Sequence, residues 1–462
     1  METNFFFCFT PLVKKISVFY MSRLVGGVCV GLGVPLAALA AREHSRASQQ
    51  CNPDDRPSTV VLATPLHSNR TRWYRLIRPV VFKLTPDPEL AHTTTVRCAQ
   101  LAGTVLVTLH ALSEVFACIR GGIANFFFSS SNIPLPPHPP STRLSTTFCG
   151  HHFALPVGVA AGFDKNGRLA DFFFHASKNL RIGHAELGSV SYRPWAGNAR
   201  PRLFRLEADR GIINRMGLNN EGAVVVASRL SESSMGTARR GLVPIGVNIT
   251  KTPDPAIEGE SAVADFVTSH SFVRHLRNCN WVTLNVSCPN TAEGTTFEDP
   301  AALRQLLESL HREDDQLLFL KLAPLSVGEW RDRGSALIQI AKQNRVSALV
   351  IGNTVPDRNL VLQSDATIAS ERGGVSGPPI FERSLPLIAM AAKEGIPVVG
   401  VGGVASGKDV FKLLQTGAGI VQLYTSMVYD GPGVFADVHN GLERLLLISD
   451  TTVAQMAESP VG

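Results

Sequence analysis

Paired cysteines are missing from this chain of 462 residues. Its eight cysteines are scattered singly, with no CxxC pair and no regular framework. Structural zinc sites and disulfide scaffolds both rely on cysteines at short, recurring spacings. The sequence therefore argues against both classes of protein, and no metal site is expected.

Acidic residues are almost missing from the N-terminal part. Glu2 is the only acidic residue among the first 42, and residues 1–83 hold 11 Lys and Arg against 4 Asp and Glu. The rest of the chain holds 33 against 34, so the net charge of +6 comes from the N-terminal part. A basic excess at one end indicates targeting or contact with a membrane surface, and no nucleic-acid partner is expected.

Residues 24–41 carry no charge at all. As a helix, these 18 residues would span roughly 27 Å, close to the thickness of a bilayer core. We therefore expect a single-pass anchor in the mitochondrial inner membrane. A cleaved secretory signal, with Ala38-Leu39-Ala40 as the cleavage site, is the alternative. It is disfavoured because the run is longer than a usual signal core and the cysteines do not suggest export.

Composition divides the whole chain into six segments. They are a targeting segment with the anchor (1–42), a polar linker (43–71), a membrane-associated helical pair (72–103), an insertion with a Pro-rich connector (104–147), the main domain (148–450) and a C-terminal tail (451–462). In the helical pair, Asp87 is expected to cap the second helix and Pro88 to begin it. The alternative for this pair is that its apolar faces simply pack on the main domain.

Eight short apolar runs recur through the main domain, separated by helical stretches. They cover residues 156–161, 185–189, 243–249, 281–286, 317–322, 348–351, 397–401 and 419–424. Buried strands alternating with helices predict an α/β fold, and eight of them predict a (β/α)8 TIM barrel. A doubly wound open sheet is the alternative, but the first βα unit lacks a Rossmann fingerprint.

Most of these runs end in small or polar residues. Lys165 follows the first run, Asn285 lies at the end of the fourth, and Lys321 lies in the fifth. A lone buried lysine is costly unless it is paired, so Lys321 is predicted to be functional. Asparagine offers both donors and acceptors to a flat heterocycle. These side chains predict a site at the C-terminal strand ends, where barrel enzymes place it.

Glycine clusters lie where barrels commonly bind phosphate. Val-Gly-Gly-Val at 401–404 follows the seventh run, Tyr-Thr-Ser at 424–426 follows the eighth, and residues 373–377 hold three further glycines. Backbone N–H groups in such loops bind phosphate. A phosphate there, a lysine below it and amides around a flat ring together predict bound FMN.

At this point the chain resembles the membrane-bound, quinone-using (class 2) dihydroorotate dehydrogenases. The resemblance covers roughly residues 73–447 apart from the 104–147 insertion. It rests on a series of short motifs in the family's order: AAGFDK (160–165), ELGS (186–189), INR (213–215), GVN (246–248), NVSCPNT (285–291), KLAP (321–324), GNT (352–354), VGG (401–403) and QLYT (422–425). In this class the helical pair forms the quinone entrance.

The resemblance implies two sets of contact residues. Those for FMN are Ala161, Lys165, Ser189, Asn248, Asn285, Lys321, Gly352, Gly377, Gly403, Tyr424 and Thr425. Those for the pyrimidine substrate are Lys165, Asn214, Arg215, Met216, Gly217, Leu218, Asn285, Asn290, Asn353 and Thr354. Lys321 would stabilise charge that develops on the flavin when it is reduced.

The implied reaction is the oxidation of (S)-dihydroorotate to orotate, the redox step of de novo pyrimidine (UMP) biosynthesis. A base removes the C5 proton, the hydrogen on C6 passes as hydride to flavin N5, and ubiquinone reoxidises the flavin. The base position holds Cys288, whereas the membrane-bound class usually has serine there. A free thiol titrates near 8.5, far below a hydroxyl, so Cys288 can act as the catalytic base without a strong activator.

Two further departures concern the substrate site. Met216 and Leu218 stand where the class usually has aromatic residues, which affects ring packing rather than the type of reaction. Cys288 resembles the soluble class, so a dihydroorotate dehydrogenase using fumarate or NAD is one alternative. A membrane-tethered flavin-binding scaffold without catalysis is the other.

Overall fold

The computed structural model describes residues 69–101, 142–233, 243–277, 279–287, 297–312, 316–324, 329–356 and 360–458. All of them belong to one compact unit, Pro65–Gly462. The predicted anchor, most of the linker and nearly all of the insertion lie outside these residues. None of the described helices is long and apolar enough to cross a bilayer. The anchor therefore stays a prediction.

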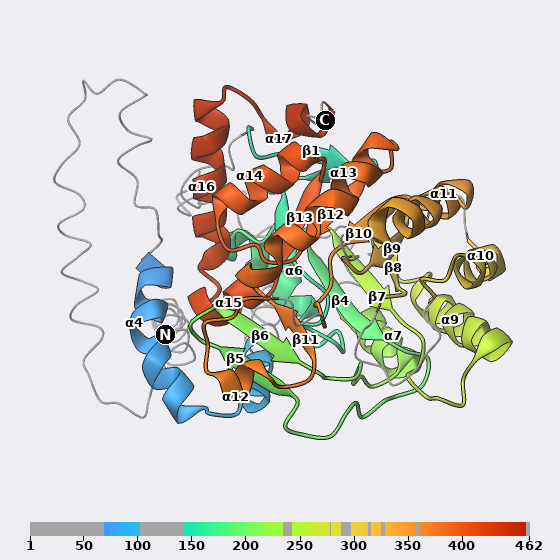
Figure 1. Cartoon of the computed structure of the whole chain (residues 1–462), viewed down its shortest axis with the longest axis horizontal. Helices are drawn as coiled ribbons and strands as arrows, with labels where there is room; N and C mark the ends of the chain where they lie inside the picture. The colour runs from blue at the N-terminus through green and yellow to red at the C-terminus, as the bar shows by residue number, and fades with distance from the viewer. Residues whose placement is uncertain are drawn as a thin grey trace, which may run out of the picture. The chain divides into compact units, whose positions relative to one another are not determined.

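Eight parallel strands close into a barrel, which confirms the predicted architecture (Figure 1). In chain order they are β3 (Val157–Val159), β4 (Ala185–Val190), β7 (Ile245–Ile249), β8 (Trp281–Asn285), β9 (Leu318–Leu322), β10 (Ala348–Ile351), β12 (Val398–Val401) and β13 (Ile420–Leu423). Every residue in them is buried, as expected for strands covered on both faces. The closed ring of strand pairs rules out the open sheet.

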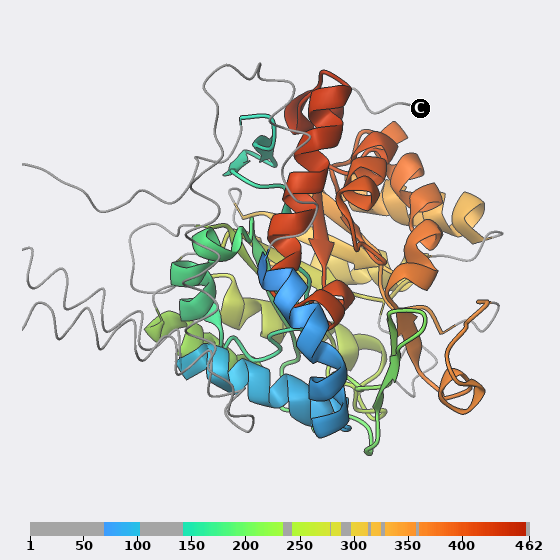
Figure 2. The same ribbon diagram turned by 90° about the vertical axis from the view of Figure 1, so that its left-hand side faces the viewer.

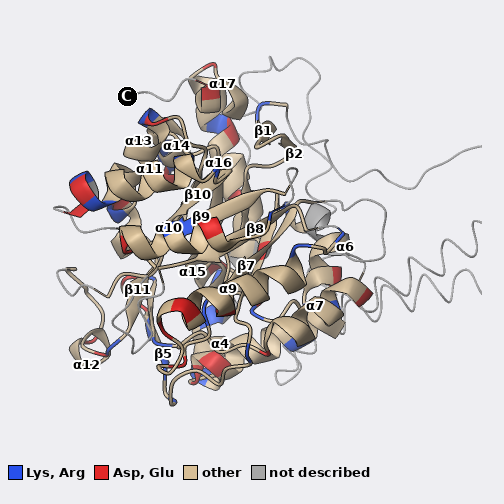
Figure 3. Cartoon of the chain, turned by 90° about the vertical axis from the view of Figure 1, so that its right-hand side faces the viewer, with Lys and Arg blue, Asp and Glu red and all other residues tan. Residues whose placement is uncertain are grey.

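Helices cover the outside of the barrel and enclose its main apolar core. They are α6 (Ala170–Leu180), α7 (Ala223–Glu232), α9 (Gly259–Val273), α10 (Pro300–Ser309), α11 (Ser335–Gln343), α13 (Leu385–Lys393), α14 (Gly407–Thr416) and α16 (Val434–Ile448). The outward strand residues, such as Val247 and Leu320, pack with buried helix residues, such as Phe266 and Leu413, in this core. Figure 3 shows that basic and acidic positions are interspersed over the helices and loops.

Aromatic residues fill the barrel at the N-terminal ends of its strands. Trp281 and Phe319 stack with ring centroids 5.3 Å apart. A hairpin of β1 (Thr146–Phe148) and β2 (His151–Phe153) adds Phe148 and Phe153 to the same buried cluster. The hairpin therefore closes this end of the barrel, so ligands have room only at the other end.

A small antiparallel sheet lies outside the barrel and was not predicted. It joins β5 (Leu203–Leu206), β6 (Gly211–Asn214) and β11 (Gly374–Ser376), and it buries Leu206, Ile213 and Val375 in a core of its own. The glycine cluster 373–377 was counted among the loops. That was wrong for residues 374–376, which pair with β6 across 160 positions of sequence, Gly374 with Asn214.

Two helices precede the barrel and dock on it (Figure 2). They are α4 (Asn69–Leu84) and a second helix over residues 88–101. Asp87 accepts from the Glu89 and Leu90 N–H groups, as expected of an N-cap. The first helix begins before the predicted end of the linker, because Asn69, Arg70 and Thr71 are already helical.

Ion pairs and hydrogen bonds fasten α4 to α15 (Thr425–Asp430). The Asp430 carboxylate is buried, and it accepts from Arg75 Nε at 2.6 Å and from Arg210 Nη2 at 2.5 Å. Tyr74 donates to the Val428 carbonyl at 3.0 Å. A further difference lies at the C-terminus, where α17 (Val453–Glu458) occupies residues expected to form a tail and buries Val453.

Candidate active site

A cavity opens at the C-terminal ends of the barrel strands. It contains about 1250 Å³ of space including its open mouth, at or above the usual range for ligand pockets. Residues at or just after seven of the eight strands line it, and the rest of the wall comes from β5, β6, the 216–218 loop, residues 376–380 and the helix over residues 88–101. The cavity therefore lies where the polar strand ends predicted a site.

Most of the predicted site residues line this one cavity. These are Ala161, Lys165, Ser189, Asn214, Met216, Gly217, Leu218, Asn285, Lys321, Gly352, Asn353, Thr354, Gly377, Gly403, Tyr424 and Thr425. Cys288 and Asn290 lie outside the described residues. The structure thus brings together residues spread over more than 260 positions of sequence.

Two predicted residues do not line the cavity. The Arg215 guanidinium is directed to the outer sheet, where it donates to Glu371 at 2.7 Å and to the carbonyls of Arg372 and Pro201. Successive residues of an extended chain point to opposite faces, so Arg215 points away from the cavity that Asn214 lines. Asn248 is fully buried beneath the cavity and donates to Glu186. A direct side-chain contact between Arg215 and substrate is not supported by this geometry.

Amides and hydroxyls at the ends of β4, β8 and β10 form one hydrogen-bond network. Asn285 Nδ2 donates to Ser189 Oγ at 3.0 Å, and Asn285 Oδ1 faces the Ser287 N–H and hydroxyl, both at 3.4 Å. Asn353 Nδ2 donates to the Ser287 carbonyl at 2.9 Å and thereby links β10 to β8. Such side chains are held in fixed orientations, which suits recognition of a flat polar ring.

Two lysines supply positive charge to the cavity. Lys321 on β9 is buried and lies directly across from Asn285 of β8 in the parallel register. Lys165 lies in the loop after β3, close to Gly162 and the Tyr424 ring. Two cations lining one cavity suit a ligand that is anionic or that gains negative charge.

The backbone at Gly402 faces open space within the cavity wall. A Cβ at this position would meet nothing nearer than the Ser384 hydroxyl at 3.5 Å, and its φ of +110° suits glycine alone. The neighbouring Gly403, with φ +73°, leaves no room for a side chain beside Phe381. This turn after β12 lets a ligand approach the main chain closely, as phosphate-binding turns require.

Sequence reasoning missed Glu89 and His92, which line the cavity from the helix over residues 88–101. Burial lowers the pKa of His92 to about 4, with a further lowering by the Lys165 charge, so the ring is neutral at pH 7. His92 also packs edge-on against Phe163, with centroids 5.3 Å apart. Their spacing of three places both on one helix face, and that spacing within an expected helix was the signal available in the sequence.

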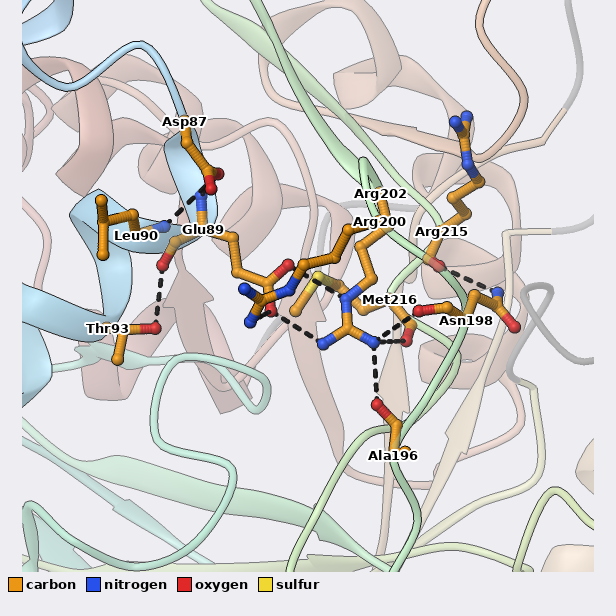
Figure 4. Close-up of polar contacts among 10 residues, drawn as sticks. All are labelled: Asp87, Glu89, Leu90, Thr93, Ala196, Asn198, Arg200, Arg202, Arg215 and Met216. Atoms are coloured by element: carbon orange, nitrogen blue, oxygen red, sulfur yellow. Dashed lines mark hydrogen bonds and ion pairs between the residues drawn. The ribbon is translucent and has the colours of Figure 1, made fainter.

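Arg202 holds Glu89 in place (Figure 4). It donates to both Glu89 oxygens, at 2.7 and 3.0 Å, and to the carbonyls of Ala196 and Asn198, both at 2.8 Å. The hydrogen bond from Arg202 is the main reason why the pKa of Glu89 lies below its usual value. Glu89 is therefore an anion that locks the second helix against the loops at the cavity mouth.

The described residues fit FMN in three respects. Gly402 leaves main chain open to a phosphate, and Lys321 and Lys165 offer cations to a flat ring that gains electrons. Two buried polar atoms, Thr354 Oγ1 in the cavity wall and Asn248 Oδ1 beneath it, make no hydrogen bond to any described residue. Buried polar atoms are normally satisfied, so each suits a hydrogen bond to a ligand: the Asn248 oxygen as an acceptor, the Thr354 hydroxyl as donor or acceptor. The donor set and the cradle thus suit a flavin mononucleotide.

Comparison with known proteins identifies the family of this chain. The family model described as "Dihydroorotate dehydrogenase" matches residues 143–446. "Dihydroorotate dehydrogenase (quinone)" of Natronomonas pharaonis is 38% identical over 306 residues, 66% of this chain and 82% of that protein. The protein of the same name from Novosphingobium aromaticivorans is 35% identical and covers 80% and 94%. The chain belongs to the dihydroorotate dehydrogenase family, and it is an enzyme.

A solved structure agrees with this assignment. Ligand-free DHODH from Eimeria tenella superposes with a TM-score of 0.64 at 28% identity, over 80% of this chain and 98% of that one. The same enzyme in complex with ferulenol gives 0.65 at 27% identity. Both comparisons extend beyond the 143–446 region, since they cover four-fifths of the chain.

Proposed function

We propose that the protein oxidises (S)-dihydroorotate to orotate with FMN as cofactor and ubiquinone as electron acceptor, in the biosynthesis of UMP. The observation that carries the proposal is one cavity that unites two lysines, three asparagine amides and an open glycine turn. The curated relatives named "Dihydroorotate dehydrogenase (quinone)" supply the reaction and the acceptor. When bound, FMN supplies a two-electron carrier between dihydroorotate and the quinone.

Each group in the cavity then has a role toward substrate or cofactor. The amides of Asn214, Asn285 and Asn353 orient the planar ring of the substrate, and Lys165 offers a cation to its carboxylate. Lys321 is placed to stabilise negative charge that arises during reduction. Cys288 removes the C5 proton, since a thiol titrates near 8.5 and can be a base at mildly alkaline pH.

The helical pair has the surface expected of a quinone entrance. Leu76, Val80 and Leu84 recur every four residues along α4 and are 70%, 45% and 70% exposed, and Leu90 and Leu101 are exposed on the second helix. Exposed apolar side chains on one helix face suit contact with lipid. We infer that this face lies on the membrane surface, from which ubiquinone enters.

Residues 1–42 extend the proposal to location. Their basic charge and the uncharged run at 24–41 support a single-pass anchor in the mitochondrial inner membrane. Fractionation of cells that express the full chain, followed by carbonate extraction of the membranes, tests this. The anchor predicts retention in the membrane pellet of mitochondria, and release into the carbonate supernatant would contradict it.

An acceptor assay separates the proposal from its enzymatic alternative. Purified protein is given dihydroorotate with decylubiquinone, fumarate or NAD as the only acceptor. The proposal expects orotate to form with the quinone and much more slowly, if at all, with the other two. Faster turnover with fumarate or NAD would favour the soluble type suggested by Cys288.

A further inference from the structure

Glu186 is a buried carboxylate to which the proposed reaction assigns no role. It lies on β4, only 1% exposed, and points into the barrel between the aromatic end and the cavity. Three N–H donors from three other strands surround it: Asn248 Nδ2 at 2.7 Å, Gln422 Nε2 at 3.0 Å and the indole N–H of Trp281 at 3.3 Å. A buried carboxylate is retained only with such partners.

These contacts determine which way two amides face. Both Asn248 and Gln422 turn their NH2 groups toward Glu186, so both amide oxygens are directed away from the carboxylate. Asn248 Oδ1 and Gln422 Oε1 are buried, and neither makes a hydrogen bond to a described residue. Glu186 therefore takes up the NH2 groups of both amides, while both amide oxygens remain available as acceptors.

The free acceptor of Asn248 lies just under the cavity. Asn248 pairs with Thr283 in the register of β7 and β8, and Asn285, two residues further along β8, lines the cavity. A buried acceptor next to a ligand site is suited to a ligand N–H. An isoalloxazine ring in its oxidised form carries one ring N–H, whereas its other polar ring atoms accept.

We propose that Glu186 is a positioning residue that fixes the amide of Asn248, so that Oδ1 accepts the ring N–H of bound flavin. This rests on the proposed function, because that function supplies the flavin. Glu186 does not touch the cofactor, and it acts through the orientation of one side chain. Without the carboxylate, the Asn248 amide can rotate by half a turn and present its NH2 group, which would oppose the ring N–H.

The test is FMN affinity, measured by fluorescence quenching as apoprotein is added to FMN. Glu186→Gln cannot accept from all three donors at once, so part of the Asn248 amides should flip, and the Kd for FMN should rise about tenfold, the effect of one hydrogen bond. In an Asn248→Leu background the same change should alter the Kd less than about twofold, because the residue through which Glu186 acts is gone. Equal effects in both backgrounds, or none in either, would overturn the proposal.

A reversed pair provides the rescue. In the double variant Glu186→Gln with Asn248→Asp, the new amide at position 186 can donate to one oxygen of the new carboxylate at position 248 and leave the other oxygen as the acceptor. FMN affinity should return to within about threefold of wild type. If Glu186→Gln alone fails to fold, the double variant still tests whether residue 186 positions residue 248. A folded double variant that does not bind FMN contradicts the proposal.

A matched control removes a buried carboxylate elsewhere. Asp265 on α9 is 5% exposed and accepts from the Thr252 N–H and hydroxyl at 2.7 and 2.8 Å, away from the cavity. Asp265→Asn should leave the FMN affinity unchanged. If wild-type apoprotein binds no FMN, the cofactor of the proposed function fails and this inference fails with it. If FMN binds but dihydroorotate does not reduce it, the proposed function fails while the affinities still decide the role of Glu186.

Discussion

The two ends of the same strands differ in what they hold. On β8, Trp281 and Asn285 both point into the barrel, and on β9 so do Phe319 and Lys321. Trp281 and Phe319 stack in a buried cluster closed by the β1–β2 hairpin, whereas Asn285 and Lys321 line an open cavity. Within one strand, the residues that pack the core thus lie only a few positions before the residues that line the cavity. The comparison implies that changes at one end should alter stability and changes at the other should alter reaction rate.

The largest expected effect is at Cys288, the proposed base. Cys288→Ala should slow anaerobic reduction of the flavin by dihydroorotate by roughly 10²–10⁴-fold, the usual contribution of a general base. Stopped-flow absorbance measures this half-reaction. Cys279→Ala is the control, because that thiol is packed away from the cavity and donates to the Trp281 carbonyl at 3.1 Å. A rate within a few-fold of wild type in Cys288→Ala would disprove the assignment.

Cys288→Ser sharpens the same prediction. A hydroxyl has a much higher pKa than a thiol, so the deprotonated base is populated only at higher pH. The variant should retain measurable flavin reduction, with its pH profile displaced upward. An unchanged profile in the serine variant would mean that another group sets the pH dependence.

Lys321→Met should separate rate from stability at the cavity end of β9. Flavin reduction should slow by about 10²–10³-fold, because a preorganised cation is removed from a buried site. The free energy of unfolding should change by less than about 1.5 kcal/mol, because methionine keeps the length and much of the volume of the buried stem. Lys342→Met, at a surface lysine paired with Glu394, is the control and should alter neither. A large loss of stability in Lys321→Met would contradict the view that the cavity end of the strand controls rate rather than stability.

Phe319→Ala should give the opposite result two residues earlier on the strand. Loss of a buried phenyl ring is expected to lower the free energy of unfolding by about 3–5 kcal/mol. Flavin reduction per folded molecule should stay within a few-fold of wild type. Urea unfolding and stopped-flow absorbance measure the two quantities. The exposed Val361→Ala should change stability by less than about 0.5 kcal/mol. Lost activity in folded Phe319→Ala would show that the two ends are coupled.

The smallest expected effect concerns pH and His184, in the aromatic end. Burial lowers the pKa of His184 to about 3, from 6.5 for an unperturbed histidine, and its ring packs edge-on to Phe153 at 5.4 Å. The folded state favours the neutral ring, so stability is full above pH 6.5 and falls as the pH drops toward 3. The slope is about 1.4 kcal/mol per pH unit for one proton. His184→Leu should reduce this slope by that amount in urea unfolding between about pH 6.5 and 5, and an identical slope would contradict it.

Local pattern predicted the barrel because each strand is a short apolar run that ends in polar residues. The same pattern placed Lys165, Asn285, Lys321 and Asn353 around one cavity, since strand ends of a barrel meet at one face. Long-range pairing was not predictable in this way. The sheet of β5, β6 and β11 depends on the match of Asn214 with Gly374, which no local window contains.

The direction of individual side chains was also beyond the sequence. Arg215 follows Asn214 directly, yet it bonds Glu371 outside the cavity, and Asn248 is turned toward Glu186 beneath it. Glu89 and His92 went unnoticed because their helix lies far ahead of the barrel in sequence and reaches the cavity only through tertiary packing.

An anaerobic titration tests the central claim most directly. Yellow purified protein is mixed with successive portions of dihydroorotate, and a quinone is then added while the flavin absorbance is followed. Bleaching should be complete near one equivalent of dihydroorotate per flavin, and the absorbance should recover when decylubiquinone is added. A flavin that dihydroorotate does not bleach, or that the quinone does not restore, would contradict the proposed function.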